Sequence, residues 1–241
     1  IAILHDLNQD GEADYYQNFN NDVVITENFH EFSFELHRDK EGNFYFIKGA
    51  PVVAGGEGFG DIKVHHGKLF KVSPDGSKLE VIASGFRAPN GLGISPKGQL
   101  SSSDNEGNWV AATPINWIQE NGFYGVQPTY AGESAPSKRS PIVCWIPHKV
   151  DNSAGGQVWV PEGEWGPYGG EMFHISYGQT KLFHVLKEEI HGQIQGGVVD
   201  IQPTGDFEAG IMRGRFNTSD KAIYLCGLKG WQTKGVKDGG L

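Results

Sequence analysis

The chain has 241 residues and a formal net charge of −9, from 29 acidic and 20 basic side chains. The negative charge and the lack of a basic stripe argue against nucleic-acid binding, and no apolar run approaches the roughly 18 residues of a membrane helix. The 35 glycines and 12% aromatic residues, without a long helical period, predict an all-β fold with many tight turns.

The length fits one large domain or part of one. The first six residues, Ile-Ala-Ile-Leu-His-Asp, lack a signal-peptide pattern and are typical of a strand that enters in the middle of a fold. We therefore expect the 241 residues to be one domain that is part of a longer protein.

The first polar segment, Asp6-Leu-Asn-Gln-Asp-Gly-Glu-Ala-Asp14, places oxygen atoms at alternate positions around a glycine. This is the spacing of the first two-thirds of a calcium loop. The ligands would be the side chains of Asp6, Asn8, Asp10 and Asp14 and the carbonyl of Glu12. Gln17 stands where an EF-hand has a bidentate glutamate, so the segment indicates either a calcium-stapled turn or a solvated turn, each with a structural role.

Similar hairpin units recur along the chain, at 39–46, 67–83, 95–103, 170–186 and 217–226. The clearest is 67–83, where Ser-Pro-Asp-Gly (73–76) separates two apolar strands. A period of roughly 55–60 residues fits the blade of a β-propeller and gives about four blades for this length. A six-bladed ring needs more chain, so we expect residues 1–241 to be one β-propeller domain that is a fragment of a larger ring or a longer protein. A β-sandwich or an irregular β-solenoid is the alternative.

Two further segments are predicted to be loops that interrupt this strand pattern. The polar, Pro- and Ser-rich stretch 130–141 predicts a surface loop between blades, since the strand pattern resumes at Ile142. The loop 104–109, Asp-Asn-Glu-Gly-Asn-Trp, follows a strand and could present carbonyls and a carboxylate to a hard cation.

Three repeats begin with a polar side chain: His30, Arg87, and Arg213 with Arg215. If the repeats are arranged radially, these groups would converge on one axis. Three guanidinium groups and an imidazole would suit an anionic cofactor and a base. A surface salt bridge is the default for any single arginine, and His37, seven residues after His30, is expected to be structural.

The cysteines Cys144 and Cys226 lie in apolar strand-like runs and predict buried free thiols, with a disulfide as the alternative in an exported protein. Haem-attachment, phosphate-binding, dinucleotide-binding and nucleophile-elbow motifs are absent from the sequence.

The stretch 84–125 resembles the soluble pyrroloquinoline-quinone (PQQ) sugar dehydrogenases, above all the sorbosone-dehydrogenase-like and membrane-bound-dehydrogenase-type propellers of bacteria. The matching motifs are Gly-Phe-Arg-Ala-Pro-Asn-Gly-Leu (85–92), Asp-Asn-Glu-Gly-Asn-Trp (104–109), Asn-Gly-Phe-Tyr-Gly (121–125) and, later, Met-Arg-Gly-Arg-Phe (212–216). The similarity covers most of the chain, from about His30 to Trp231.

The resemblance implies a six-bladed propeller with the quinone over the central axis and His30 as the general base. Arg87, Arg213 and Arg215 would hold the carboxylates and quinone oxygens of the cofactor. The carbonyls of Gly107 and Asn108 would bind a calcium ion that also touches the quinone. The family usually has proline where Asn108 stands, and a family lysine near the cofactor has no clear counterpart in 176–180, where Gln179 would substitute.

The resemblance also implies the activity: a PQQ- and calcium-dependent dehydrogenase that oxidises a sugar, sugar aldehyde or polyol by hydride transfer to the quinone. A cytochrome c is a candidate electron acceptor, and a periplasmic or secreted location is expected. One alternative is a non-catalytic propeller that binds carbohydrate or protein partners through aromatic loops at Trp109, Trp117, Trp165, Tyr168 and Trp231. Another is a calcium-dependent lactonase-type hydrolase, although the axial candidates here are mainly arginines.

Overall fold

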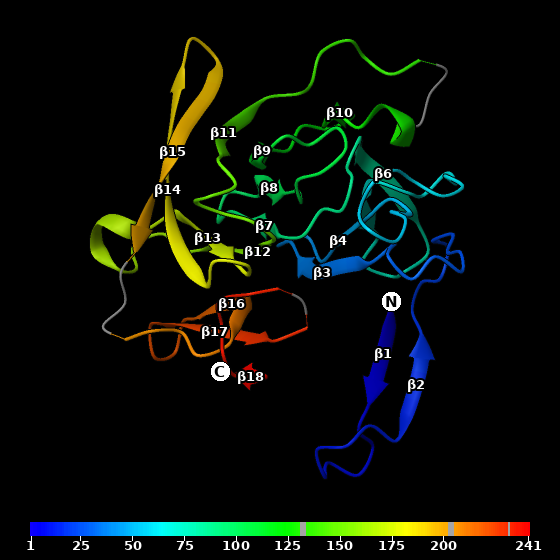
Figure 1. Cartoon of the computed structure of the whole chain (residues 1–241). Helices are drawn as coiled ribbons and strands as arrows, with labels where there is room; N and C mark the ends of the chain where they lie inside the picture. The colour runs from blue at the N-terminus through cyan, green and yellow to red at the C-terminus, as the bar shows by residue number, and fades with distance from the viewer. Residues whose placement is uncertain (131–133, 202–204, 231) are drawn as a thin grey trace.

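The computed structural model describes residues 1–130, 134–201, 205–230 and 232–241. Strands joined by loops make up nearly all of these residues (Figure 1). Two single-turn 3-10 helices, Gln127–Thr129 and Gly166–Tyr168, are the exceptions within the described ranges. The all-β prediction is therefore confirmed, and no helix in the described part is long and apolar enough to span a membrane.

Four sheets follow one another along the chain, and each is built on an antiparallel meander whose strands pair in chain order. The first sheet also includes β10 (Gly122–Phe123), which pairs in parallel with β6. The first sheet contains β3 (Ser33–Arg38), β4 (Phe44–Lys48), β5 (Lys68–Val72) and β6 (Leu79–Ser84). The second contains β7 (Leu92–Ile94), β8 (Leu100–Ser103), β9 (Thr113–Trp117) and β11 (Ile142–Ile146). The third contains β12 (Ala154–Trp159), β13 (Met172–Ser176), β14 (Lys181–Ile190) and β15 (Gln193–Ile201). The fourth contains β16 (Gly210–Asn217), β17 (Ala222–Leu228) and β18 (Gly239–Gly240).

The first strands of successive sheets lie next to one another: β3 contacts β7, β7 contacts β12, and β12 contacts β16. Sequential meander sheets with adjacent first strands are the architecture of a β-propeller. The four sheets match the number of blades expected for this length. Whether the complete ring has six blades stays a prediction.

Apolar side chains fill the spaces between neighbouring sheets. Ile47 and Leu69 of the first sheet pack against Leu92 of the second, and Ile115 of the second packs in one cluster with Met172 of the third. A third cluster joins the third and fourth sheets through Val158, Ile175 and Ile211. Each such side chain contributes about 1.5–3 kcal/mol on burial, so sheet-to-sheet packing is the main stabilising contact of the fold.

The hairpin predicted at 67–83 is confirmed as β5 and β6. Its turn follows from local chemistry. Ser73 N donates to the carbonyl of Lys78 at 3.0 Å, Asp75 Oδ1 accepts from Ser77 N at 3.1 Å, and Gly76 has a φ of 75°. A positive φ of this kind favours glycine, because other residues pay a steric cost there.

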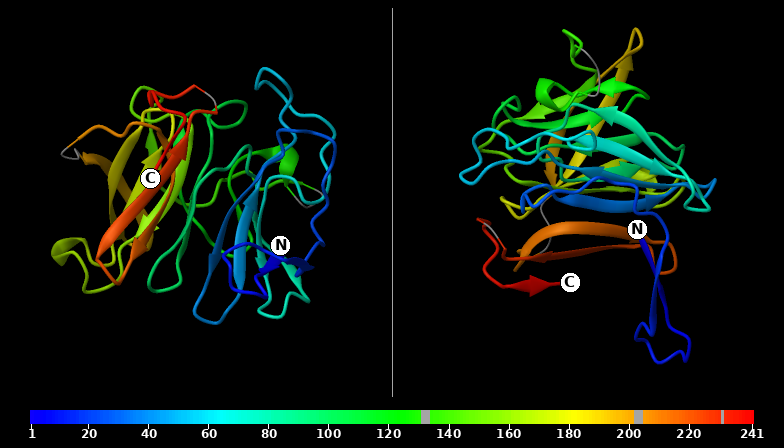
Figure 2. Two further views of the ribbon diagram at one scale, coloured as in Figure 1. Left: turned by 90° about the horizontal axis from the view of Figure 1, so that it is seen from below. Right: turned by 90° about the vertical axis from the view of Figure 1, so that its right-hand side faces the viewer.

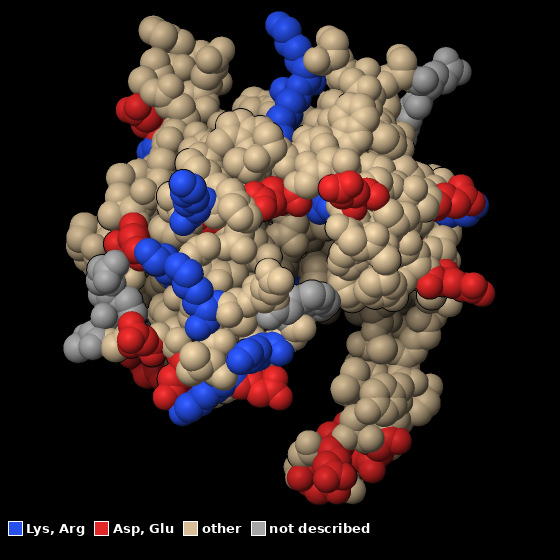
Figure 3. Space-filling view, in the orientation of Figure 1, with Lys and Arg blue, Asp and Glu red and all other residues tan. Residues whose placement is uncertain are grey.

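Strand β1 (Ala2–His5) and strand β2 (Tyr15–Asn18) form a separate two-stranded ribbon. It projects from the rest of the molecule (Figures 1 and 2). The segment 6–14 is the turn at its tip, where acidic side chains gather on the surface (Figure 3).

Two sequence-based expectations differ from the structure, whereas the segment 130–141 connects two blades, as predicted. It returns from β10 (Gly122–Phe123), which pairs in parallel with β6 of the first sheet, to β11 of the second; residues 131–133 lie outside the described part. Cys144 is half-buried and Cys226 is exposed, both as free thiols. Cys226 lies at an outward-facing position of β17, so the apolar residues around it in the sequence wrongly predicted that its thiol is buried.

The second difference concerns the arginines. Arg87 lies in the loop before β7, as expected for the start of a repeat, whereas Arg213 and Arg215 lie inside β16. The starting points of the repeats are therefore not equivalent. The local pattern around 212–216 is that of a strand with alternating side chains, not of a turn.

Candidate functional site

The first strand of each sheet begins, and the second strand ends, at the same end of the molecule, which we call the top face. The loops 26–32, 49–53, 84–91, 104–110 and 176–180 lie there. Backbone hydrogen bonds join them: Gly49 N donates to the carbonyl of Phe32 at 2.9 Å, and Ala50 N donates to the carbonyl of Arg87 at 2.7 Å. The top face thus brings the loop of His30 to the loop of Arg87.

His30 lies just before β3 with its ring between two phenylalanines. Phe29 stacks on it at 5.2 Å between ring centroids, and Phe32 meets it edge-on at 5.5 Å. Its Nδ1 is buried and has no hydrogen-bond partner among the described residues. Burial, followed by the nearby Arg87 guanidinium, lowers the pKa of His30, and a hydrogen bond between its ring and the backbone of Val52 partly opposes this shift. The imidazole is therefore neutral at pH 7 and has a lone pair available for a proton.

The loop that carries His30 is held by Glu31, which no motif in the sequence identified. Its carboxylate accepts hydrogen bonds from the backbone N and the hydroxyl of Thr26, the latter at 3.1 Å. It also contacts Lys48 Nζ at 3.1 Å and His66 Nε2, and both of these side chains are 0% exposed. Within the same loop, Asn28 Oδ1 accepts from His30 N at 2.8 Å.

The donors around Glu31 decide its charge. Burial alone would raise its pKa, but the hydrogen bonds from Thr26, His66 and Lys48 lower the pKa of Glu31 to about 2. His66 Nδ1 accepts from the backbone N of Lys63 at 2.9 Å, so its Nε2 carries the proton that faces Glu31. The network is a neutral His66 and a buried Glu31–Lys48 ion pair.

Arg87 is fixed by the loop after β8. Its backbone N and that of Ala88 each donate at 2.8 Å to the carboxylate of Asp104. Its guanidinium donates to the carbonyl of Gly56, and its Nε is buried without a partner in the described part. A Cβ on Gly107 would lie 2.3 Å from Arg87 Cζ, and Gly107 has a φ of 144°. The guanidinium thus occupies the space that any side chain at 107 would need.

The predicted calcium ligands Gly107 and Asn108 lie beside Arg87. The carbonyl of Gly107 accepts from Val110 N at 2.9 Å and keeps a second lone pair. The side-chain oxygen of Asn108 accepts from Gly58 N at 2.5 Å, which ties the loop 104–110 to the loop 54–60. The described residues contain no group of three or more His, Cys, Asp or Glu side chains that could hold a metal. Calcium at these carbonyls stays a prediction.

The segment 6–14 satisfies its own carboxylates. Asp6 accepts from the backbone N atoms of Gln9, Asp10 and Gly11, at 2.6, 3.2 and 2.9 Å. Asp14 accepts from Leu7 N at 2.7 Å. Such bonds are typical of Asx turns, and the Asn8 amide adds a side-chain donor to Asp10 Oδ2 at 3.0 Å. These residues thus form an exposed turn closed by internal hydrogen bonds, and calcium binding there stays a prediction.

Arg213 and Arg215 form a second group, which we call the ion cluster, with Glu35 and His37 of β3. Arg213 Nε lies 3.2 Å from Glu35 Oε1, and Arg215 NH2 lies 3.1 Å from Glu35 Oε2. His37 Nε2 lies 3.3 Å from Glu35 Oε2, and the Glu35 side chain is 0% exposed. Burial would raise the pKa of Glu35, but His37 and the two arginines lower it. The carboxylate is therefore ionised and pairs with both guanidinium groups.

Glu35 also has a φ of 61°, which is uncommon for a residue with a side chain. Strained backbone of this kind persists where the surroundings fix it and is concentrated at functional sites. Glu35 joins the first sheet to the fourth across 180 residues of sequence. That separation explains why the sequence pattern did not reveal it.

The predicted residues thus fall into separate contact groups. His30, Arg87, Gly107 and Asn108 share the top face between the first and second sheets. Arg213 and Arg215 belong to the ion cluster, and no hydrogen bond or ion pair between described residues links them to Arg87. Gln179 lies in the turn after β13, where its backbone N donates to Ser176 Oγ at 3.2 Å and its side chain donates to Asn152.

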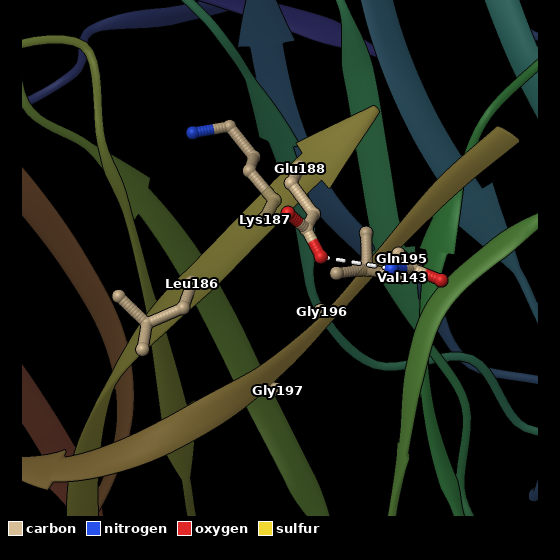
Figure 4. A pocket seen from close by; sticks show the side chains of 7 residues that line it. All are labelled: Val143, Leu186, Lys187, Glu188, Gln195, Gly196 and Gly197. Atoms are coloured by element: carbon tan, nitrogen blue, oxygen red, sulfur yellow. Dashed lines mark hydrogen bonds between the residues drawn. The ribbon is translucent and has the colours of Figure 1, made fainter. Parts of the chain in front are cut away.

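Two cavities of the molecule lie mostly apart from the predicted site residues. A cavity of about 470 Å³ runs along the β14–β15 hairpin beside Val143 of β11 (Figure 4). Its walls include Gly196 and Gly197, and a 2.8 Å hydrogen bond from Gln195 to Glu188 lies across it. None of the predicted site residues lines it. A second cavity, of about 550 Å³, is lined in part by Glu35 of the ion cluster.

Comparison with known proteins places the fold. No protein-family model and no curated protein matches the chain. Among solved structures, a Thermus thermophilus oxidoreductase described as a glucose dehydrogenase is 17% identical at a TM-score of 0.60, over 85% of this chain and 62% of that one. Another glucose dehydrogenase is 15% identical at a TM-score of 0.63, over 96% of this chain and 68% of that one.

The PQQ-bound form of an aldose sugar dehydrogenase from Streptomyces coelicolor is 14% identical at a TM-score of 0.58, over 85% of this chain and 59% of that one. The chain thus spans about six-tenths of the length of the structures it matches. At such low identities the likeness establishes the fold. The chain has the fold of the soluble β-propeller sugar dehydrogenases, as the resemblance of its sequence motifs predicted.

Proposed function

We propose that this chain is the catalytic core of a PQQ- and calcium-dependent dehydrogenase that oxidises a sugar, sugar aldehyde or polyol. The observation that carries the proposal is the proximity of His30 to Arg87 at the top face, where His30 Nδ1 and Arg87 Nε are buried without a hydrogen-bond partner among the described residues. Buried polar atoms usually have a partner, and a ligand or water between these two side chains would supply one.

The residues at the top face fit such a cofactor. Arg87 offers an unused Nε–H, and arginine suits carboxylate and quinone oxygens because its donors lie in one plane. Gly107 leaves the guanidinium room, and its carbonyl with that of Asn108 would face a hard cation. When bound, the quinone would accept the hydride from the substrate, a reaction that amino-acid side chains do not perform.

His30 would act as the general base. Its neutral imidazole would take the proton of the substrate hydroxyl as the C–H bond breaks, a contribution of about 10²–10⁴-fold in rate. The Glu31 network would hold the loop so that the ring keeps its position. The phenylalanines on either side would exclude water from the ring.

Arg213, Arg215 and Gln179 remain candidates for binding the quinone. The ion cluster has two guanidinium groups for one carboxylate, Glu35, so it retains positive charge that an anionic cofactor would use. Arg215 is the more exposed of the two arginines and still has free donors. A cytochrome c as electron acceptor and a periplasmic or secreted location belong to the same proposal.

The test is reconstitution of the protein with PQQ and Ca²⁺, followed by dye reduction with a panel of aldoses and polyols. We expect substrate-dependent reduction that falls by at least about 100-fold in His30→Ala. His191→Ala, at the exposed β14–β15 turn, is the matched control and should keep full activity.

Two results would count against the proposal. If absorbance and calorimetry detect no binding of PQQ to the folded protein, PQQ would be excluded as its cofactor. Calcium-dependent hydrolysis of a sugar lactone without quinone would favour the lactonase-type alternative instead.

A further inference from the structure

The end of the molecule opposite the top face carries an aromatic pocket of about 270 Å³ between the second and third sheets. It lies where β7, β9 and β12 end and β13 begins. We define it by six of its lining residues: Lys97, Trp117, Trp159, Glu162, Glu171 and Lys187. None of them belongs to the top face or to the ion cluster.

Two indole rings form the apolar part of the aromatic pocket. The ring centroids of Trp117 and Trp159 lie 6.3 Å apart with an interplanar angle of 57°. Trp159 is fixed, because its Nε1 donates to Ser101 Oγ at 3.3 Å and Lys187 Nζ lies 5.2 Å over its ring. Trp117 is half-buried and keeps part of its surface toward the cavity. The pocket thus has a rigid floor and one aromatic wall.

Two ion pairs form the polar part. Lys97 lies 3.3 Å from Glu162 Oε1, and Lys187 lies 2.9 Å from Glu171 Oε2. Each glutamate therefore uses one oxygen, and no described residue donates a hydrogen bond to the other. The Lys187–Glu171 pair is largely buried, whereas the Lys97–Glu162 pair is exposed at the rim. Charged acceptors and donors at the edge of an aromatic surface favour a ligand with many hydroxyl groups.

We infer that the aromatic pocket binds a single saccharide ring. A sugar offers a C–H face that packs on an indole and hydroxyls around its edge that pair with carboxylates and ammonium groups. Ligand pockets for drug-sized molecules begin at about 300 Å³, so this smaller cavity suits one ring rather than an oligosaccharide. An organic cation fits less well, because Lys187 already covers the Trp159 face.

The other aromatic residues predicted to offer stacking surfaces do not form a comparable site. The indole N–H of Trp165 donates to the carbonyl of Lys221 at 2.5 Å, and its ring packs edge-on against Phe173 and Phe216. Trp109 is exposed and has no aromatic neighbour among the described residues. Trp231 lies outside the described part of the chain. Of the described aromatic residues predicted to bind carbohydrate, Trp117 is therefore the one that lines a defined pocket.

The experiment measures binding of D-glucose, D-galactose, D-mannose and D-xylose by tryptophan fluorescence and by ligand-observed NMR, without PQQ or Ca²⁺. We expect saturable binding of at least one of these sugars in the millimolar range, and a loss of at least about tenfold in affinity in Trp117→Ala. Trp145→Ala is the matched control, because Trp145 is 42% exposed on the neighbouring strand β11 and does not line the pocket.

Glu162→Gln provides a second variant that keeps the aromatic core, and it should weaken binding of the same sugar at least threefold. His30→Ala should leave binding unchanged, which separates this inference from the proposed dehydrogenase. Absence of saturable binding for all four sugars would overturn the inference, as would equal loss in Trp117→Ala and Trp145→Ala.

Discussion

Glu31 and Glu35 are the two carboxylates around which the candidate site is built, and neither stands out in the sequence. Each is buried and paired with cations from other strands: Glu31 with Lys48, and Glu35 with Arg213 and Arg215. Removing one member of a buried pair leaves a charge without compensation, which typically costs about 3–5 kcal/mol. Single substitutions at these positions should therefore have large and specific effects.

We predict that Glu31→Gln lowers the free energy of unfolding by about 3 kcal/mol at pH 7. It should also remove part of the pH dependence of this free energy below pH 4.5. The pKa of Glu31 is lowered from 4.5 to about 2 in the folded protein. Its stabilising contribution is thus complete above pH 4.5 and is lost as the pH falls toward 2.

Urea unfolding at pH 7, 4.5 and 3 checks this prediction. The difference between wild type and Glu31→Gln should be nearly the same at pH 7 and pH 4.5 and clearly smaller at pH 3. Glu41→Gln, at an exposed turn, serves as the control and should change stability little. A difference that stays constant over this pH range would contradict the assigned role of Glu31.

Glu35 should limit the affinity of the ion cluster for anions. Glu35→Gln leaves two guanidinium groups without a negative partner, so we predict that binding of sulfate or inorganic phosphate becomes about tenfold tighter, equal to about 1.4 kcal/mol. Thermal-shift titration and calorimetry would measure it, with Glu120→Gln as a control of the same total charge. Weaker binding in Glu35→Gln would instead mean that Glu35 orients the arginines for the ligand.

At the scale of the elements, the loop 104–110 is the piece of structure that positions Arg87. Asp104 holds the arginine backbone, and Gly107 leaves the space that its guanidinium fills. The glycine is required twice over, by its φ of 144° and by the close approach of Arg87. This loop was recognisable in the sequence through its motif, although its contact with Arg87 was not.

We therefore predict that Gly107→Ala displaces the Arg87 guanidinium and lowers PQQ affinity at least tenfold, because the new Cβ would lie 2.3 Å from Cζ. Gly98→Ala is the matched control: Gly98 has a φ of 86°, and no atom lies within 4 Å of the position that a Cβ would take there. The control should lose only the backbone term of about 1 kcal/mol in stability. Equal PQQ affinity in the two variants would show that Arg87 does not contact the cofactor.

The elements that could be predicted are those specified locally. Ser-Pro-Asp-Gly at 73–76 fixes its turn by its own side chains and by a glycine with positive φ, and the β5–β6 hairpin follows. The strand position of Arg213 and Arg215 could not be read in the same way. It depends on pairing with β17 and on the buried partner Glu35, which lies in another sheet.

At the scale of the whole molecule, the periodic hairpins predicted the four meander sheets because each sheet is continuous in sequence. The candidate site is different, because its contacts cross sheets. Arg87 meets Gly56 and Gly107, and the ion cluster joins β3 to β16. Sequence motifs identified the arginines of these contacts, whereas their partners Gly56 and Glu35 became visible only in the folded structure.

The same packing predicts an uneven stability across the sheets. All five residues of β13 are buried in the third sheet, whereas β17 of the fourth sheet alternates between half-buried and exposed positions. Backbone amides open more readily where few buried apolar contacts hold them. We expect the amides of β17 to exchange with deuterium at least about 100-fold faster than those of β13, a difference of about 2.7 kcal/mol in opening free energy.

The ion cluster adds a second, testable link at this scale. Glu35 of β3 forms ion pairs with Arg213 and Arg215 of β16 and so ties the fourth sheet to the first. Glu35→Gln should therefore speed the exchange of backbone amides in β16 and β17 and leave the exchange in β13 unchanged. Hydrogen-exchange mass spectrometry of the wild type and the variant measures both effects. Uniform protection of β13 and β17, or an acceleration spread over all four sheets, would mean that the sheets unfold as one unit and that Glu35 does not anchor the fourth sheet.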